Sequence, residues 1–328
     1  MLGLIVPLFL GCNENLPDPA MSSTPVPTPI VVGTPSPEFT SPTPKPVVEN
    51  NERKEVLMAG VAAAIEESRA KFPGETGVCF IDIESNQELS YNADARFESA
   101  SLMKLVVITE VFRRIQVGEL ELERPLTLQP DQIVGGSGDL KNQEAGTSFP
   151  ISVLVEKMIT QSDNTATQML TDFITKEKLN ESVKNLGLKG TTIDRDIYDF
   201  AAIDRGQDNY ITAKDAALLM SQLAREELPG SNEIHAILER QQRNDMIGHA
   251  FPPGVRVAHK TGELNGIVHD VGVVYAPRGA YALALLSDQV TDKEKAIEIW
   301  AELSSKILKL YQQESPSPTP TEGTPVSN

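Results

Sequence analysis

Three short polar motifs stand in order along the chain, and their residue types suit nucleophilic catalysis. They are Ser101–Lys104, Ser162–Asn164 and Lys260–Gly262. A serine hydroxyl is a poor nucleophile until a base takes its proton. Residues three apart on a helix share a face, so the Lys104 amine can reach the Ser101 hydroxyl. The spacing therefore predicts an activated serine at position 101.

The second motif and the two lysines supply the groups that such a serine needs. A neutral Lys104 can act as the base where burial and a nearby cation lower its pKa, and Lys260 is the candidate for that cation. The Ser162 hydroxyl can relay a proton to a leaving nitrogen, and the Asn164 amide can hold a substrate amide. The chain thus offers the parts of an acylation machinery.

The third motif is expected at the end of a strand, where it can bind an extended acyl substrate. The Thr261 hydroxyl and the Lys260 ammonium suit a carboxylate, and the strand edge around Gly262 offers backbone groups. The backbone N–H groups of Ser101 and Glu263 are the predicted oxyanion hole, because they flank the place where the reacting carbonyl must lie.

Each motif also has a purely structural interpretation. Ser101 and Ser162–Asn164 can cap helices, and Lys104 and Lys260 can be solvated surface lysines. Any one of these short patterns arises by chance in many chains, but all three in this order, each on the expected element, are far rarer. The combination therefore favours catalysis, which capping does not exclude.

Other chemistries fit the sequence less well. The histidines at positions 235, 249, 259 and 269 show no metal-ligand spacing, so neither a metal nor an organic cofactor is expected. A Ser-His-Asp hydrolase needs G-x-S-x-G, and Gly135–Gly138 followed by Asp139 fails that pattern. The formal net charge of −17 argues against a nucleic-acid partner. Cys79, inside an apolar run, is expected to be a buried, unreactive thiol.

Hydrophobic periodicity gives the elements that must position these residues. Helices are expected over 52–71, 101–115, 153–160, 165–174, 176–186, 212–225 and 293–310. Strands are expected over 78–83, 88–91, 255–259, 267–275 and 281–287, and 191–210 is expected to be a long ordered loop. Strands at both ends without βαβ alternation predict an α+β domain: one antiparallel sheet flanked by helices, with an all-helical lobe, about 101–211, inserted.

The motifs and their context resemble the class A β-lactamase and penicillin-recognising serine hydrolase family. The resemblance rests on Phe97–Leu105, Met158–Thr167 and His259–Gly262, and it covers nearly the whole core, from about Glu52 to Tyr311. It implies a β-lactamase/transpeptidase-like fold and a serine hydrolase acylated at its motif serine. The implied substrate is a β-lactam or an acyl-D-Ala-D-Ala-like compound.

The sequence departs from that family in one loop. The run Gly187–Arg195 resembles the approach to the family's Ω-loop, in which β-lactamases carry a glutamate two residues after the arginine to activate the deacylating water. Here Ile197 stands at that position, with Asp196 and Asp199 nearby. Asp199 is the best stand-in base, although an ion pair of Asp199 with an arginine of the loop, at position 195 or 205, is the favoured interpretation. The resemblance therefore predicts acylation followed by slow deacylation.

The ends of the chain are expected to lie outside the folded domain, which is predicted over 51–312. Residues 1–12, an apolar run ending in Gly11 and Cys12, resemble a bacterial lipoprotein signal peptide, in which the cysteine becomes lipidated. Residues 13–50 and 313–328 are rich in Pro, Ser and Thr and are predicted to be a disordered tether and tail. These features predict an extracytoplasmic monomer held on a membrane by a lipid.

Three functions remain open at this point. The first is a β-lactamase that hydrolyses its acyl-enzyme with an unconventional base. The second is a D,D-peptidase-like or esterase-like acyl hydrolase or transferase on the same scaffold. The third is a tethered module that binds β-lactams or cell wall with little turnover. The absent glutamate is the feature that separates the first from the other two.

Overall fold

The computed structural model describes residues 47–249, 251–277 and 279–312, which form a single domain. Cys12, the rest of the predicted signal peptide, residues 13–46 of the tether and the tail 313–328 lie outside the described residues. Helix α1 (Val47–Lys71) begins five residues before the predicted start at 52. The last proline of the tether is Pro46, so the four residues that follow it are free to join the helix.

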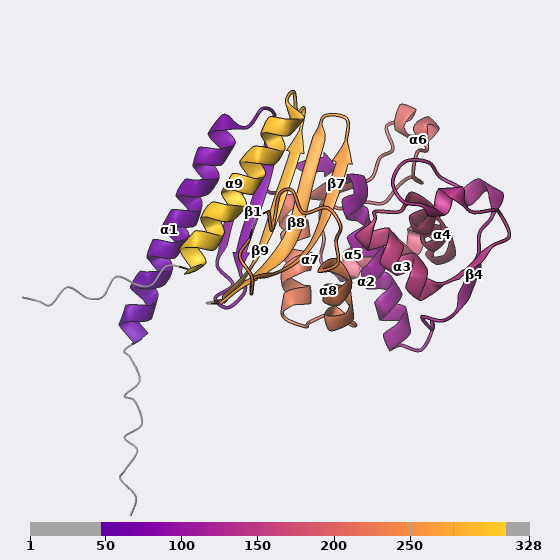
Figure 1. The fold of residues 1–328 in the computed structure, drawn as a ribbon, viewed down its shortest axis with the longest axis horizontal. Helices are drawn as coiled ribbons and strands as arrows, with labels where there is room; N and C mark the ends of the chain where they lie inside the picture. Colours follow the sequence, from indigo (N-terminus) through magenta and orange to yellow (C-terminus); the bar gives the residue numbers. More distant parts are fainter. Residues whose placement is uncertain (1–46, 250, 278, 313–328) are drawn as a thin grey trace, which may run out of the picture. The chain divides into compact units, whose positions relative to one another are not determined.

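The centre of the domain is a five-stranded antiparallel sheet in the order β2-β1-β9-β8-β7 (Figure 1). Its strands are β1 (Glu75–Asp82), β2 (Glu88–Tyr91), β7 (Arg256–Leu264), β8 (Ile267–Ala276) and β9 (Gly279–Asp288). Strand β1 pairs directly with β9, so the two ends of the domain meet inside one sheet. The predicted fold class, an antiparallel sheet with an inserted lobe, is confirmed.

The central strands bury both faces, and alternate side chains enter two separate cores. In β1, Val78 and Phe80 pack toward helices α1 and α9 (Lys293–Gln312), whereas Cys79 and Ile81 belong to the core on the opposite side. This alternation follows from the two-residue period of a strand. Figure 1 shows α1 and α9 side by side, and both helices cover the same face of the sheet. Helix α7 (Ala213–Ala224) contacts the other face.

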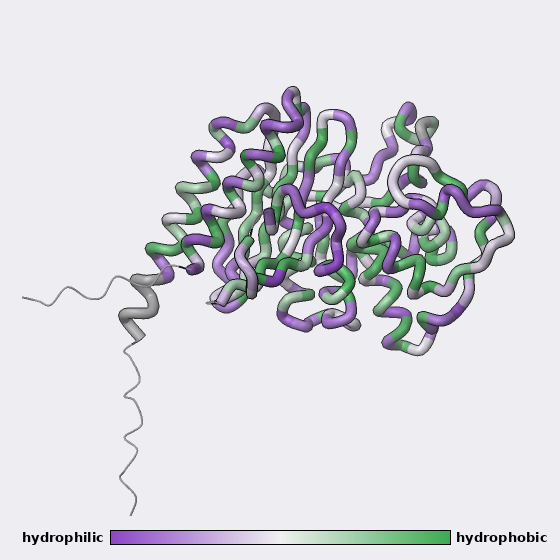
Figure 2. The backbone as a smooth tube through the Cα atoms, viewed as in Figure 1, coloured by the Kyte–Doolittle hydropathy of each residue, from purple (hydrophilic) through white to green (hydrophobic). Residues whose placement is uncertain are grey.

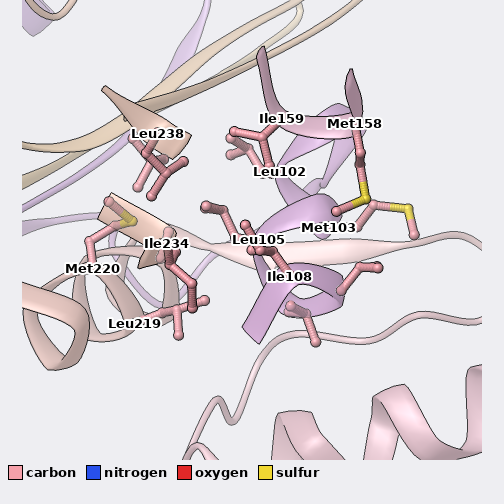
Figure 3. Close-up of a cluster of buried hydrophobic side chains, with 14 of the residues drawn as sticks. Leu102, Met103, Leu105, Ile108, Met158, Ile159, Leu219, Met220, Ile234 and Leu238 are labelled. Carbon is pink, nitrogen blue, oxygen red and sulfur yellow. The ribbon is translucent and has the colours of Figure 1, made fainter. Parts of the chain in front are cut away.

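The inserted lobe is built from four helices around one apolar cluster. They are α2 (Met103–Gln116), α3 (Ile151–Thr160), α4 (Asn164–Ile174) and α5 (Lys176–Asn185). Figure 3 shows the part of the cluster where α2 and α3 meet α7 and α8 (Ser231–Leu238). It labels Leu102, Met103, Leu105, Ile108, Met158, Ile159, Leu219, Met220, Ile234 and Leu238, all of which are buried. The cluster therefore joins the lobe to the sheet side of the domain.

Two short strands stand at the entry and exit of the lobe. Strand β3 (Arg96–Glu98) pairs with β6 (Tyr210–Thr212), with Phe97 opposite Ile211. The chain thus enters and leaves the lobe at one place. A further pair, β4 (Pro125–Thr127) with β5 (Ser148–Pro150), lies within the lobe. Figure 2 shows hydrophobic segments along the central strands and α2, and hydrophilic segments at many of the loops.

Strand β7 is longer than predicted, and this changes the setting of the third motif. The sequence predicted a strand ending at 259, but β7 pairs with β8 as far as Leu264, opposite Ile267. Asn265 and Gly266 form the two-residue turn between them, and Gly266 has a φ of +76°. Asn-Gly is the preferred pair for such a turn. Lys260–Gly262 therefore lies inside a strand rather than at its end.

Candidate active site

Ser101 and Lys104 lie where the backbone tightens before a buried helix. Ser101 is in the 3-10 turn η1 (Ala100–Leu102), directly before α2, and Ala100 has a φ of +45°. The Lys104 side chain is only 1% exposed, and its Nζ lies 3.0 Å from Ser101 Oγ. The predicted pairing of nucleophile and amine is thus present in the geometry.

The second motif closes a hydrogen-bond chain around this pair. Ser162, between α3 and α4, has a φ of +55°, a conformation that a non-glycine residue adopts only where its surroundings hold it. Its Oγ lies 2.8 Å from Ser101 Oγ, 3.0 Å from Lys104 Nζ and 3.2 Å from Lys260 Nζ. The chain Lys260–Ser162–Ser101–Lys104 is therefore continuous.

The partners of the Lys104 amine fix where its lone pair can point. Its Nζ lies 2.7 Å from the Ser162 carbonyl oxygen and 3.0 Å from Asn164 Oδ1, two groups that can only accept. A neutral amine has two protons to donate and one lone pair. The two protons suit these two oxygens, so the lone pair is left for the Ser101 hydroxyl, whose oxygen accepts from Ser162.

Burial and charge both favour a neutral Lys104. Burial lowers the pKa of Lys104 well below its usual range, the charge of Lys260 lowers it further, and Asp163 opposes the shift. Burial also lowers the pKa of Lys260, to about 7, against the opposing charge of Asp270. Two ammonium groups that share one dry site repel each other, so the protonated states of the two lysines compete.

Asp163, the middle residue of the second motif, is structural. Its carboxylate is fully buried and accepts the backbone N–H groups of Ala166, Asp139 and Leu140. A Cβ at Gly138 would lie 2.1 Å from Asp163 Oδ2, so only glycine fits beside it. This carboxylate caps α4 and holds the loop of residues 137–140 against the site.

The third motif brings a strand against Ser101. A Cβ at Gly262 would lie 3.3 Å from the backbone nitrogen of Ser101, so β7 and η1 approach closely here. Thr261 and Glu263 line the same cavity as Ser101, which has a volume of about 1410 Å³. Lys260 is fully buried, and its Nζ contacts Ser162 Oγ and the Thr261 carbonyl oxygen, two residues that line that cavity. The structure thus brings together Ser101, Lys104, Ser162, Asn164 and Lys260–Glu263.

Several residues of this site carry no signal in the sequence. Ser137, Gln241, Arg243 and Lys293 also line the cavity, although they come from two loops and from the first turn of α9. Ser137 lies in the glycine-rich run 135–138, which does not match the G-x-S-x-G pattern and so was not predicted to be part of the site. These positions converge only in the folded chain, so a linear pattern could not have found them.

The loop that carries Arg243 is tied to the sheet by a buried histidine. His259 Nδ1 lies 2.8 Å from Asp270 Oδ1, and its Nε2 lies 2.7 Å from Asn244 Oδ1. The Asn244 amide nitrogen donates to the Gln241 carbonyl, which turns its oxygen toward the ring. Both ring nitrogens thus face oxygens, one on β8 and one on the loop that carries Arg243.

The Ω-like loop shows a different ion pair from the one expected. Arg195 Nε lies 2.6 Å from Asp208 Oδ1, and Arg205 donates to Gln207, so the favoured pairing of Asp199 with either arginine is wrong. Asp199 instead caps the short helix α6 (Phe200–Asp204), accepting the Ala202 N–H at 2.9 Å. This helix lies inside the segment 191–210, which was predicted to be a loop.

The position of the absent glutamate is held by a residue without a proton acceptor. The Ile197 backbone N–H donates to Gln168 Oε1 at 3.3 Å, and Asp196 forms an ion pair with Lys176 at 2.6 Å. The next residue, Tyr198, has a φ of +60°. A Cβ at Gly136 would lie 2.3 Å from the Tyr198 hydroxyl and 2.8 Å from Asn164 Nδ2. The loop thus reaches the catalytic motifs through a tyrosine that sequence reasoning overlooked.

The known proteins to which this chain is similar include beta-lactamases and PBP-A. The profile of the beta-lactamase enzyme family matches residues 60–311. A beta-lactamase of Bacillus licheniformis is 24% identical over 256 residues, 76% of this chain and 80% of that protein. A beta-lactamase structure from Sphaerobacter thermophilus has a TM-score of 0.71 at 28% identity, covering 79% of this chain and 99% of that one. A structure of PBP-A has a TM-score of 0.71 at 26% identity, covering 77% and 96%. A PBP-A mutant, similar at a TM-score of 0.70 and 26% identity over 78% and 97% of the two chains, is an acyl-enzyme complex with penicillin G.

Proposed function

Because the chain belongs to the beta-lactamase enzyme family and is a β-lactamase-like serine hydrolase, we propose that β-lactams acylate Ser101 and that the adduct is hydrolysed slowly. The observation that carries the proposal is the continuous hydrogen-bond chain from Lys260 through Ser162 and Ser101 to Lys104. Each link lies between 2.8 and 3.2 Å, which is within the range for proton transfer.

In the proposed acylation, the neutral Lys104 amine takes the proton of Ser101 as Oγ attacks the β-lactam carbonyl carbon. The backbone N–H groups of Ser101 and Glu263 stabilise the oxyanion that forms. The carbon–nitrogen bond of the ring then breaks, and the nitrogen receives a proton from the Ser162 hydroxyl. Ser162 regains that proton through the lysine network. The ring opens and Ser101 carries an ester.

The remaining motif groups bind the substrate in this proposal. The Asn164 amide holds the acylamide of the substrate side chain, and Thr261 and Lys260 face its carboxylate. Gly262 lets β7 lie close to η1, because a side chain at this position would crowd that turn. No organic cofactor or metal takes part in these steps.

Deacylation is the slow step in this proposal. Ile197 cannot accept a proton from water, and a lost general base costs about 10²–10⁴ in rate. Asp199 is the candidate replacement. One of its carboxylate oxygens is engaged as the cap of α6, which leaves the other for a water molecule. Its position also differs from that of the family glutamate, and even a small displacement of a base slows the transfer.

A second function is favoured by the similarity to PBP-A. A protein that acylates readily and deacylates slowly can serve as a D,D-peptidase-like acyl hydrolase or transferase, or as a cell-wall-binding module. Both alternatives use the same acylated serine. They differ from a β-lactamase in the lifetime of the acyl-enzyme and in the acceptor that removes the acyl group.

The proposed location is outside the cytoplasm, on a membrane. We expect Cys12 to carry a lipid, with the Pro-rich segment that follows it holding the domain away from the bilayer as a monomer. Within the described ranges, no helix combines the length and the apolarity that crossing a bilayer requires.

Intact-mass spectrometry after a penicillin pulse tests the main proposal, because it follows acylation and deacylation separately. The parent chain is expected to gain the mass of one penicillin within the pulse and to lose it over minutes or longer. Ser101→Ala is expected to gain nothing, and Lys104→Ala is expected to acylate at least about 10²-fold more slowly. Equal labelling of Ser101→Ala would exclude this serine as the nucleophile.

A further inference from the structure

We propose that the Glu263 side chain is a selectivity element: it pairs with Arg243 and Lys293, two cations that line the cavity, so that a substrate anion must compete with it for them. The inference rests on the proposed acylation of Ser101. It concerns the carboxylate of Glu263 alone, whose backbone N–H has a separate role in the oxyanion hole. The expected effect of this carboxylate is to lower the acylation rate of anionic substrates relative to that of neutral ones.

Glu263 bridges two cations that come from different parts of the chain. One carboxylate oxygen, Oε2, pairs with Arg243 Nη1, and the other, Oε1, pairs with Lys293 Nζ. Arg243 lies in the loop before β7, and Lys293 opens α9. The side chains of Glu263, Arg243 and Lys293 are 26%, 35% and 47% exposed, so water screens these ion pairs only in part.

All three groups line the cavity that contains the nucleophile. Ser101 and Thr261 line it as well, and Glu263 is only two residues after Thr261 along β7. Among the described lining residues, Arg243 and Lys293 are the cationic ones, and both are bound to Glu263. An anionic substrate that enters the cavity therefore meets cations that already have a carboxylate.

The bridge is held in place from both sides. Arg243 Nε also contacts the Asp245 carboxylate at 3.0 Å, and the neighbouring Asn244 is hydrogen-bonded to the buried His259. The Ile247 N–H donates to Asp270 of β8 at 2.8 Å, which ties the end of this loop to the sheet. Since Glu263 lies in β7 itself, neither end of the Arg243 contact is on an unsupported segment.

The competition has a definite consequence for charge selection. A carboxylate-bearing substrate gains little from Arg243 and Lys293 while Glu263 holds them. A neutral ester of the same compound does not use these cations and is unaffected by the competition. Replacing the Glu263 carboxylate by an amide of the same shape frees Lys293 from its carboxylate and leaves Arg243 with Asp245 as its acidic partner. The preference for the anion over the ester should then rise.

The test compares the acylation rates of penicillin G and of its carboxyl methyl ester, measured by intact mass. The readout is the ratio of the two rates, which cancels effects that fall on both substrates equally. Glu263→Gln is expected to raise the anion-to-ester ratio about tenfold, the scale of a partly exposed charge-assisted contact. Glu263→Asp, one methylene shorter, is expected to hold only one cation and to give an intermediate ratio.

Glu294→Gln is the matched control, because Glu294 is an exposed carboxylate that also lines the cavity. It removes the same charge but leaves the bridge intact, so its ratio is expected to stay within about twofold of the parent. An equal rise in Glu294→Gln and Glu263→Gln would overturn the proposal in favour of general repulsion. An unchanged ratio in both Glu263 variants, each with a parent-like thermal melt, would overturn it too.

The two proposals fail in different ways. If neither compound labels Ser101 of the parent chain, the acylation itself is wrong, and the selectivity role falls with it. If both compounds label Ser101 and the anion-to-ester ratio of acylation rates is the same in the parent chain and the Glu263 variants, only the selectivity role is wrong. If Glu263→Gln does not fold, Glu263→Asp decides the question with the same ratio.

Discussion

The chemistry of single residues in this site depends on two lysines that share one buried pocket. Lys104 and Lys260 both contact Ser162 Oγ, so the charge on one disfavours the charge on the other. In the proposed acylation, Lys104 must be neutral to accept the proton of Ser101. Its lowered pKa supplies that neutral form well below the pH at which a free lysine would lose its proton.

The first prediction is a pH profile of acylation. The rate is expected to rise with pH as Lys104 loses its proton, and to level off at a pH far below 10.5. Lys260→Met removes a neighbouring charge that lowers the pKa of Lys104, so the midpoint is expected to move to higher pH. Acylation by a fluorescent penicillin, followed between about pH 5 and 10, measures both midpoints. A profile that is flat in the parent chain would contradict the base assignment.

Cys79 gives a second prediction at this scale. Burial raises the pKa of its thiol to about 12, and the side chain is fully buried in the core beside β1, a strand that lies between β2 and β9. Since the thiolate is the nucleophile, Cys79 is expected to resist iodoacetamide in the native state and to react once the chain unfolds. The measurement uses the Cys12→Ser variant, in which Cys79 is the one cysteine that can be alkylated. Rapid alkylation of that variant without denaturant would show that this strand opens.

Among the elements, the segment 191–210 is the one on which the proposed slow deacylation depends. Ile197→Glu is expected to speed deacylation, because it adds a proton acceptor at the position of the absent glutamate. Asp199→Asn keeps an oxygen that can accept the Ala202 N–H, so α6 retains its cap while the possible base is lost. Slower deacylation in Asp199→Asn would therefore report on base chemistry. Fast penicillin hydrolysis, unaffected by Asp199→Asn and Asp196→Asn, would place the base elsewhere.

The junction of α3 and α4 gives an element-scale prediction of stability. Asp163→Ala would leave three backbone N–H groups without their acceptor, at a cost of about 3 kcal/mol in the free energy of unfolding. Asp139→Ala is the control, because the Asp139 side chain is 54% exposed and its ion pair with Lys157 is worth less than about 1 kcal/mol. Urea unfolding of both variants measures the difference. Equal losses would argue against the capping role.

The sequence predicted most elements, because periodic apolar residues report burial directly. It located the strands of the sheet and the lobe helices, and the three motifs meet as expected. It placed the end of β7 too early, at 259, although Asn265-Gly266 is a sequence that favours a two-residue hairpin turn. It also missed α6, whose cap is a lone aspartate. Arg243 and Lys293 had no signal at all, because only tertiary contacts bring them to Ser101.

At the scale of the whole molecule, the prediction concerns attachment. In a bacterial host the mature chain is expected to fractionate with membranes and to carry a lipid on Cys12. Cys12→Ser is expected to release the chain or to leave it unprocessed, with the acylation of Ser101 unchanged in the released form. Fractionation and mass spectrometry of the first residue measure this. A soluble mature protein that starts after residue 12 would contradict the anchor.

The pairing of β1 with β9 also sets the order in which the domain can fold. Register partners such as Val78 and Leu285 stand about 200 residues apart, and contacts of such long range form slowly. During synthesis the apolar residues of β1 leave the ribosome early, and the edge of β1 that pairs with β9 stays unpaired until β9 has been made. A chain stalled on the ribosome before residue 279 is therefore expected to remain sensitive to protease. Until the last strands have been made, the chain is expected to stay unfolded and to be a substrate for chaperones.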